Sequence, residues 1–158
     1  MIDVERVVTW SPTERTTYEE LETSEIHVAA TNLSRAVRFY SRVFGFEAVR
    51  SSADGASVEM RIAPGKTLLI HDAGSAVRLG VRHLRRWGFV VNDLDTVRQL
   101  VWELGVTVAR DSGAADHIYR WANGRSLYVR APDGVEIELV EIGPGADERP
   151  AREARRAV

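Results

Sequence analysis

The segment EIHVAATNLSRAVRFYSRVFGFEAVR, residues 25–50, has the pattern of a strand, a helix and a second strand. A related segment, RWGFVVNDLDTVRQLVWELGVTVAR, occupies residues 86–110. Aligning Leu33 with Leu94 superposes the two segments, with a difference of one residue in the length of the helix. Because a repeat of this kind marks a duplicated structural unit, the sequence predicts a pair of related modules.

The two predicted helices carry residues that begin and end helices. Asn32 and Asp93 can act as N-caps, because their side-chain oxygens accept hydrogen bonds from the free amides of the first turn. Gly45 and Gly105 follow the helices and can end them. Between these ends, apolar residues recur at helical spacing, namely Leu33, Val37, Tyr40 and Phe44 in the first copy and Leu94, Val97, Val101 and Leu104 in the second.

A weaker match joins MRIAPGKTLLI, residues 60–70, to YVRAPDGVEIEL, residues 128–139. Each segment has a strand, an Ala-Pro turn with glycine, and another strand. The expected fold class is therefore α+β, with two tandem βαβββ modules at residues 25–72 and 85–142. Residues 72–84 join the two modules.

The 158-residue chain has 44% hydrophobic residues, 28% charged residues and a net charge of -2, which is the composition of a soluble globular protein. This charge balance gives no reason to expect nucleic acid as a partner, and no apolar run approaches the roughly 18 residues that a membrane span needs. The chain has no cysteine, which excludes disulfides and thiolate chemistry. Acidic residues near the start disfavour a secretory signal, so we expect a cytoplasmic protein.

Residues 1–24 are expected to form an N-terminal arm or lid, and residues 143–158 a flexible C-terminal tail.

Three segments carry a resemblance to a known family: NLSRAVRFYSRVFGFE, VVNDLDTV and APDGVEIELVE. They resemble the vicinal-oxygen-chelate superfamily, which includes glyoxalase I, extradiol dioxygenases, methylmalonyl-CoA epimerase and the fosfomycin- and bleomycin-resistance proteins. The resemblance covers residues 25–142. It implies that the sheets of the two modules curl into a cup-shaped mixed sheet. Because relatives commonly dimerise, it also implies a homodimer.

Strand alternation indicates which side chains face the cup. In the first module these are Glu25 and His27, and in the second they are Arg86, Glu136 and Glu138. Metal-using relatives place a histidine in the first strand of each module and a glutamate in the closing strand, and the matching positions here are Glu25, Arg86 and Glu138. Arginine stays protonated and has no lone pair for a metal. We therefore expect that the three-ligand site is lost and that Arg86 pairs with Glu138 or Glu25, so that no cofactor is bound.

Other interpretations of these residues stay open. A reorganised metal site could use Glu25, His27 and Glu138, whose donor atoms suit zinc, iron or manganese. Alternatively, Glu138 could belong to an ordinary solvated strand face. His71 lies near the corresponding position of the first module, but His71 and His83 are interpreted as turn or surface histidines.

Aromatic residues of the segment SGAADHIYRWANG, residues 112–124, and of the next strand are further candidates for ligand binding. Trp121, His117 and Tyr128 are expected to line the cup, where aromatic rings can stack on a flat ligand. The alternative is that Tyr119 and Trp121 only close the end of the core.

The resemblance leaves two functions in competition. One is a small-molecule-binding protein with a degraded metal site, which binds or sequesters an organic ligand, or transforms it without a metal, as in bleomycin-resistance-like proteins. For a metal-free reaction the catalytic candidates are His27, Glu138 and Arg86, with His27 the better base, because a neighbouring arginine lowers the pKa of a carboxylate. The alternative is a metal-dependent enzyme of the glyoxalase, dioxygenase or epimerase type that uses Glu25, His27 and Glu138.

Overall fold

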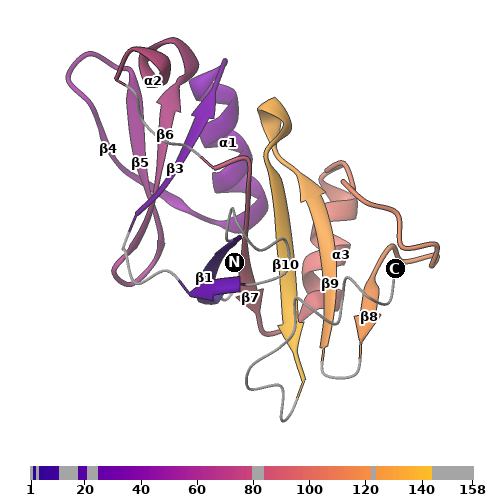
Figure 1. The fold of residues 1–158 in the computed structure, drawn as a ribbon. Helices are drawn as coiled ribbons and strands as arrows, with labels where there is room; N and C mark the ends of the chain where they lie inside the picture. Colours follow the sequence, from indigo (N-terminus) through magenta and orange to yellow (C-terminus); the bar gives the residue numbers. More distant parts are fainter. Residues whose placement is uncertain are drawn as a thin grey trace. The chain divides into compact units, whose positions relative to one another are not determined.

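The protein, analysed as a computed structural model, forms two compact units (Figure 1). The structure describes residues 2, 4–10, 18–20, 25–79, 84–121 and 124–143. Among these, the first unit contains residues 2, 25–79, 84–85 and 131–135, and the second contains residues 4–10, 18–20, 86–121, 124–130 and 136–143. Each unit is built around one sheet.

The first unit contains a four-stranded mixed sheet. Its elements are β3 (Glu25–Ala30), α1 (Leu33–Phe44), β4 (Glu47–Ser51), β5 (Ser57–Ala63), β6 (Lys66–Asp72), α2 (Ala73–Leu79) and the 3-10 helix η1 (Pro132–Gly134). The strand order is β3-β6-β5-β4, with β3 parallel to β6 and the other pairs antiparallel. One face of this sheet packs against α1.

Helix α1 begins and ends where the sequence predicts. The side chain of Asn32 accepts a hydrogen bond of 2.9 Å from the Arg35 N–H group. At the other end, Gly45 has a φ of 74°, a left-handed conformation that glycine adopts without steric cost. The buried side of the helix carries Tyr40 and Phe44.

The predicted alternation of β3 is also confirmed. Ile26, Val28 and Ala30 are buried, whereas Glu25 is exposed and His27 is partly exposed. The apolar residues therefore belong to the core of the unit, and the polar residues lie on the opposite face of the sheet.

Helix α2 lies in the segment that was expected only to join the modules. The Oδ2 atom of Asp72 accepts a hydrogen bond of 3.3 Å from the N–H group of Ser75 in the first turn of this helix. Helix α2 has only 7 residues. It is therefore too short to show a clear helical spacing of apolar residues, and the sequence pattern does not predict it.

The second unit contains a six-stranded sheet. Its elements are β1 (Val4–Trp10), β2 (Tyr18–Glu20), β7 (Arg86–Val91), α3 (Leu94–Glu103), β8 (Tyr119–Trp121), β9 (Gly124–Arg130) and β10 (Glu136–Ile142). The strand order is β2-β1-β7-β10-β9-β8, in which β7 and β10 are parallel and the other neighbours are antiparallel. Helix α3 begins at Asp93, whose Oδ1 atom accepts a hydrogen bond of 3.1 Å from the Thr96 N–H group, as predicted.

Strands β1 and β2 extend the second sheet beyond β7. Strand β1 pairs antiparallel with β7, with Val8 opposite Gly88. The sequence predicts an arm or lid for residues 1–24 and gives no indication of this pairing. The rest of that segment and residues 144–158 of the expected tail lie outside the described residues.

Both units contain the order strand, helix and three strands, as β3-α1-β4-β5-β6 and β7-α3-β8-β9-β10. The predicted α+β class with two tandem βαβββ modules is therefore confirmed, while the cup stays a prediction. Over the residues described, no helix is both long enough and apolar enough to cross a membrane.

Candidate functional site

The face of the second sheet that points away from α3 carries three of the predicted site residues, Arg86, Tyr128 and Glu138. Glu141 lies on the α3 side, because its Oε2 atom accepts a hydrogen bond of 2.6 Å from the Leu94 N–H group at the start of α3. Alternation along β10 then places Glu136 and Glu138 on the opposite face. The strand register adds their neighbours on that face, Arg86 and Arg130 beside Glu136, and Gly88 and Tyr128 beside Glu138. We call this surface the polar face of the second sheet.

Glu138 is fully buried on the polar face, with 0% of its surface exposed. Its Oε1 atom accepts a hydrogen bond of 2.6 Å from the hydroxyl group of Ser126, which is also 0% exposed. The interpretation of Glu138 as a solvated strand residue is therefore wrong. Burial of a carboxyl group is costly unless it is hydrogen-bonded, and Ser126 supplies such a bond.

Gly88 allows β7 to lie directly against Glu138. A Cβ atom at this position would lie 2.6 Å from the backbone oxygen of Glu138 and 3.3 Å from its Cβ atom. Only a residue without a side chain fits this contact without a shift of the backbone.

Arg86 and Arg110 share one carboxylate oxygen on the polar face. The Nε atom of Arg86 lies 3.5 Å from Oε1 of Glu136, and the Nη2 atom of Arg110 lies 2.7 Å from the same oxygen. The side chain of Glu136 is 12% exposed, and those of Arg86 and Arg110 are 37% and 30% exposed. From the sequence we expect Arg86 to pair with Glu138 or Glu25, and the sequence carries no signal for Arg110.

Arg110 reaches this site because the chain before it is hydrogen-bonded to β9. The Ala109 N–H group donates to the Tyr128 carbonyl oxygen (2.8 Å), and the Arg130 N–H group donates to the Thr107 carbonyl oxygen (2.9 Å). Arg110 then extends over the ring of Tyr128, with its Cζ atom 4.6 Å from the ring centroid. This distance is typical of a cation–π contact.

Tyr128 and Tyr119 form an edge-to-face pair, with ring centroids 5.3 Å apart and planes at 86°. Their exposed fractions are 2% and 9%. The Tyr119 hydroxyl group donates to the Asp111 carbonyl oxygen (2.7 Å), and burial raises the pKa of Tyr119 above its usual range. For Tyr119, the alternative of a core-closing role fits this burial.

The other two candidates for ligand binding are placed differently. His117 has a φ of 59°, and its Nδ1 atom lies 3.2 Å from Oδ1 of Asp111. The Gly113 N–H group and then His117 lower the pKa of Asp111. This contact indicates a role in shaping the loop. The backbone of Trp121 belongs to β8, but its side chain lies outside the described part of the structure.

In the first unit, Glu25, His27 and His71 form a chain of polar contacts. The Nδ1 atom of His27 lies 2.8 Å from Nε2 of His71, and its Nε2 atom lies 3.4 Å from Oε2 of Glu25. His71 is a buried residue of β6 at 9% exposure, so its interpretation as a turn or surface histidine is wrong. The contact results from the parallel pairing of β3 and β6, which places His71 opposite Ala29 on the same face as His27.

The two imidazole rings are arranged to share a hydrogen bond. Their planes are 9° apart and their centroids 5.1 Å apart. The centroid distance exceeds the Nδ1–Nε2 distance of 2.8 Å by about two ring radii, so His27 and His71 lie end to end. A carboxylate beside Nε2 of His27 favours a proton on that nitrogen, so that Nδ1 accepts a hydrogen bond from Nε2–H of His71.

The residues at the family's ligand positions do not fit a three-ligand metal site. Arg86 has no lone pair to donate. In the first unit, Leu69 lies opposite His27 on the same face of β3 and β6 and offers no donor atom. Within the described ranges, no group of three or more His, Asp or Glu side chains is arranged to hold a metal ion. The reorganised site of Glu25, His27 and Glu138 draws on both units and stays a prediction.

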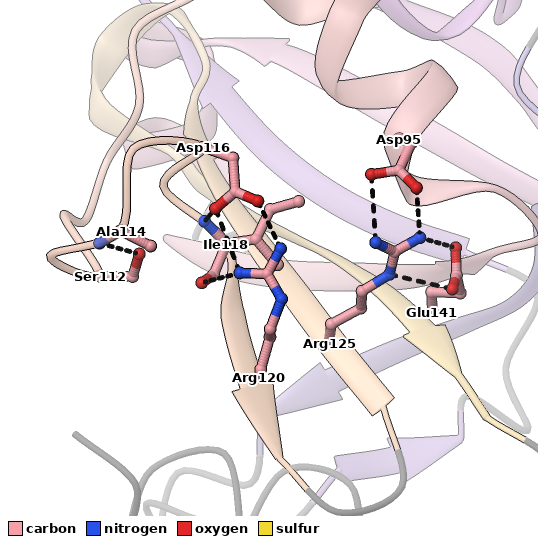
Figure 2. Close-up of polar contacts among 8 residues, drawn as sticks. All are labelled: Asp95, Ser112, Ala114, Asp116, Ile118, Arg120, Arg125 and Glu141. Atoms are coloured by element: carbon pink, nitrogen blue, oxygen red, sulfur yellow. Dashed lines mark hydrogen bonds and ion pairs between the residues drawn. The ribbon is translucent and has the colours of Figure 1, made fainter.

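The α3 side of the second sheet carries ion pairs that support the fold (Figure 2). Arg125 lies between two carboxylates, with its Nη2 atom 2.8 Å from Oδ2 of Asp95 and its Nε atom 3.0 Å from Oε1 of Glu141. Hydrogen bonds to Glu141 and then to Asp95 raise the pKa of Arg125. Farther along, Asp116 pairs with Arg120, whose hydrogen bonds lower the pKa of Asp116 to about 2.

Comparison with known proteins identifies the family. The sequence profile of the Glyoxalase/Bleomycin resistance protein/Dioxygenase superfamily matches residues 23–139. A lactoylglutathione lyase from Agrobacterium tumefaciens is 25% identical, with a TM-score of 0.61 over 74% of this chain and 90% of that one. No match was found among curated protein sequences.

Two further solved structures have the same fold at lower identity. TioX from Micromonospora sp. ML1 is 18% identical, with a TM-score of 0.60 over 73% of this chain and 92% of that one. A glyoxalase/bleomycin resistance protein from Catenulispora acidiphila DSM 44928 is 22% identical, with a TM-score of 0.54 over 76% and 97%. The two βαβββ modules and the profile match over most of the chain lead to one conclusion: the protein belongs to the Glyoxalase/Bleomycin resistance protein/Dioxygenase superfamily.

Proposed function

We propose that this protein binds a small organic ligand at the polar face of the second sheet without using a metal ion, and thereby sequesters the ligand. The observation that carries the proposal is Arg86, which stands where metal-using relatives have a histidine ligand. Its Nε atom lies 3.5 Å from Oε1 of Glu136. A guanidinium group supplies positive charge and N–H donors but cannot coordinate a metal.

The neighbouring residues support a binding role. Arg86 and Arg110 are both partly exposed, and Arg110 is held in place by Glu136 and by the ring of Tyr128. Polar groups that are held in place before the ligand arrives reduce the entropy lost on binding. In this arrangement the guanidinium groups attract the polar atoms of a ligand. They take the role that a metal ion has in metal-using relatives.

An enzyme that works without a metal is the second candidate, and the contact between His27 and His71 favours it. Glu25, His27 and His71 form a chain of a carboxylate and two imidazoles that can hold and transfer a proton. The names of the relatives cover both roles, since one is a lactoylglutathione lyase and another a glyoxalase/bleomycin resistance protein. A metal-dependent enzyme is the remaining possibility, and its test is metal binding.

Ligand screening of chelator-treated protein tests the proposal. Thermal shift measurements select candidate ligands, and calorimetry in the presence of chelator measures their affinity. We expect at least one ligand to bind without added metal and to bind at least tenfold more weakly to Arg86→Gln, since hydrogen bonds to a charged group contribute about 1.5–3 kcal/mol. The matched control is Arg120→Gln, which removes an ion-paired arginine from the other face of the same sheet.

Two results contradict the proposal. One is a set of ligands that bind only after a divalent metal is added. The other is a set of ligands whose affinity is the same for Arg86→Gln as for the wild-type protein. The proposal also includes a homodimer, which the family resemblance implies, and a cytoplasmic location. Sedimentation velocity of the purified protein tests the dimer.

A further inference from the structure

We infer that the arginine cluster at one end of the polar face, formed by Arg86, Arg110 and Arg130 around Glu136, binds an oxyanion group of the ligand, a carboxylate or a phosphate. This inference rests on the proposed function and names the chemical class of the ligand. Arg86 and Arg130 are the direct cross-strand neighbours of Glu136 on either side. Arg110 contacts Glu136 from the loop that connects α3 to β8.

The charge balance of the cluster favours an anion. Arg86 and Arg110 contact Glu136, and Arg130 is its cross-strand neighbour, while the next carboxyl group on this face, that of Glu138, is buried and hydrogen-bonded to Ser126. Counted together with Glu138, these named residues are three arginines and two glutamates. A surface of this kind attracts ligands of opposite sign and raises their rate of association.

Arg110 has the geometry of a binding residue. Its guanidinium group contacts Glu136 through Nη2 and lies over the ring of Tyr128. Among the described residues these are its polar and ring contacts, which leaves N–H groups on its other nitrogens for a ligand. Because the guanidinium group is held by Tyr128 and Glu136 and 30% of the side chain is exposed, the group can form a two-point contact with an oxyanion at small entropic cost.

Glu136 holds Arg86 and Arg110 close to each other. Its Oε1 atom lies near both Arg86 and Arg110, so the two like-charged groups stay close together without a ligand. Partly exposed ion pairs contribute little net stability, so a competing oxyanion can share these arginines without a large loss. Loss of Glu136 is therefore expected to raise oxyanion affinity while making the cluster less rigid.

Calorimetric titration with two simple probes, benzoate and inorganic phosphate, tests the inference at constant ionic strength. We expect saturable binding of at least one probe to the wild-type protein, and the preferred probe identifies the oxyanion as carboxylate or phosphate. Arg110→Gln should weaken that binding about tenfold or more. Arg110→Lys, which keeps the charge but loses the planar fork, should give an intermediate affinity. The control Arg120→Gln should bind like the wild-type protein.

The outcomes separate the inference from the proposed function. If neither probe binds, or if Arg110→Gln and Arg120→Gln bind equally well, the inference is overturned. If uncharged ligands from the screen still bind chelator-treated protein in that case, the proposed function stands. Circular dichroism and the unfolding midpoint of each variant confirm that a loss of binding is not a loss of fold.

Discussion

The hydroxyl group of Ser126 donates a hydrogen bond of 2.6 Å to Oε1 of Glu138, and both residues are fully buried. Ser126 belongs to β9 and Glu138 to the neighbouring β10. By the family resemblance, Glu138 stands at the position of a carboxylate metal ligand, and its neighbour in register on β7 is Gly88. Ser126 of the same sheet therefore holds one oxygen of this carboxyl group, while Arg86 lies one row away, opposite Glu136.

Removing the Ser126 hydroxyl group should destabilise the fold. Ser126→Ala leaves the buried Glu138 carboxyl group without this donor, which should lower the free energy of unfolding by about 1–3 kcal/mol. Urea denaturation at neutral pH measures the change. The control is Ser41→Ala on the exposed side of α1, which should have almost no effect. Equal effects for the two variants would mean that the buried hydrogen bond contributes nothing.

Filling the space at Gly88 should also be costly. In Gly88→Ala the new Cβ atom would lie 2.6 Å from the backbone oxygen of Glu138, so β7 and β10 must separate. Overpacking of this kind lowers the free energy of unfolding by about 1–3 kcal/mol. In Gly74→Ala, the control in α2, the new atom would meet only the end of the Asp72 side chain at 3.3 Å, which can move. A wild-type unfolding midpoint for Gly88→Ala would show that the two strands are not in this register.

The pair formed by Asp116 and Arg120 should contribute stability that depends on pH. Hydrogen bonds from Arg120 lower the pKa of Asp116 from its usual 3.8 to about 2. Because the folded pKa is the lower one, the contribution is present above pH 3.8 and is lost as the pH falls from 3.8 to about 2. The pair is partly exposed, so Asp116→Asn should cost only about 0.2–1 kcal/mol at neutral pH and nothing near pH 2.

Urea denaturation of the wild-type protein, Asp116→Asn, Arg120→Gln and the double variant between pH 2 and 7 checks this prediction. The two single variants should lose similar stability at neutral pH, and the double variant should lose less than their sum. A loss that stays constant down to pH 2 would contradict the assignment of the effect to the Asp116 carboxylate.

In their neutral forms, His27 and His71 should carry the ring proton on Nε2, whereas His117 should carry it on Nδ1. In the neutral state we expect Nε2–H for His27, because Glu25 lies at that nitrogen, and Nε2–H for His71, which donates to His27. His117 serves as the control, since Asp111 lies at its other nitrogen and favours Nδ1–H. Long-range ¹H–¹⁵N correlation spectra of labelled protein distinguish the two tautomers. Detection of Nδ1–H on neutral His27 would rule out the proposed direction of the bond to His71.

The local features of the fold could be predicted from the sequence because local rules determine them. The caps at Asn32 and Asp93 depend on one side chain and the following turn, and both are present. The alternation in β10 placed Glu138 correctly on the face opposite α3, because a strand has a period of two residues. Strand β1 was not predicted, because its pairing with β7 depends on a partner far along the chain.

The contacts of the candidate site were harder to predict. Arg110 lies in a loop without periodicity, and it reaches Tyr128 only because residues 107–109 pair with β9. His71 meets His27 through the register of β3 with β6, which hydrophobic pattern alone does not fix to a single row. For the same reason the sequence could place Arg86 on the correct strand but could not select Glu136 as its partner.

The most direct test of the central claim is metal binding by the wild-type protein and Glu138→Gln. Chelator-treated samples are titrated calorimetrically with zinc, manganese and ferrous iron. The account predicts no stoichiometric binding that depends on Glu138, because Arg86 replaces a ligand with a group that cannot coordinate. Binding of one metal ion per chain that disappears in Glu138→Gln would contradict the account and indicate a metal-dependent enzyme.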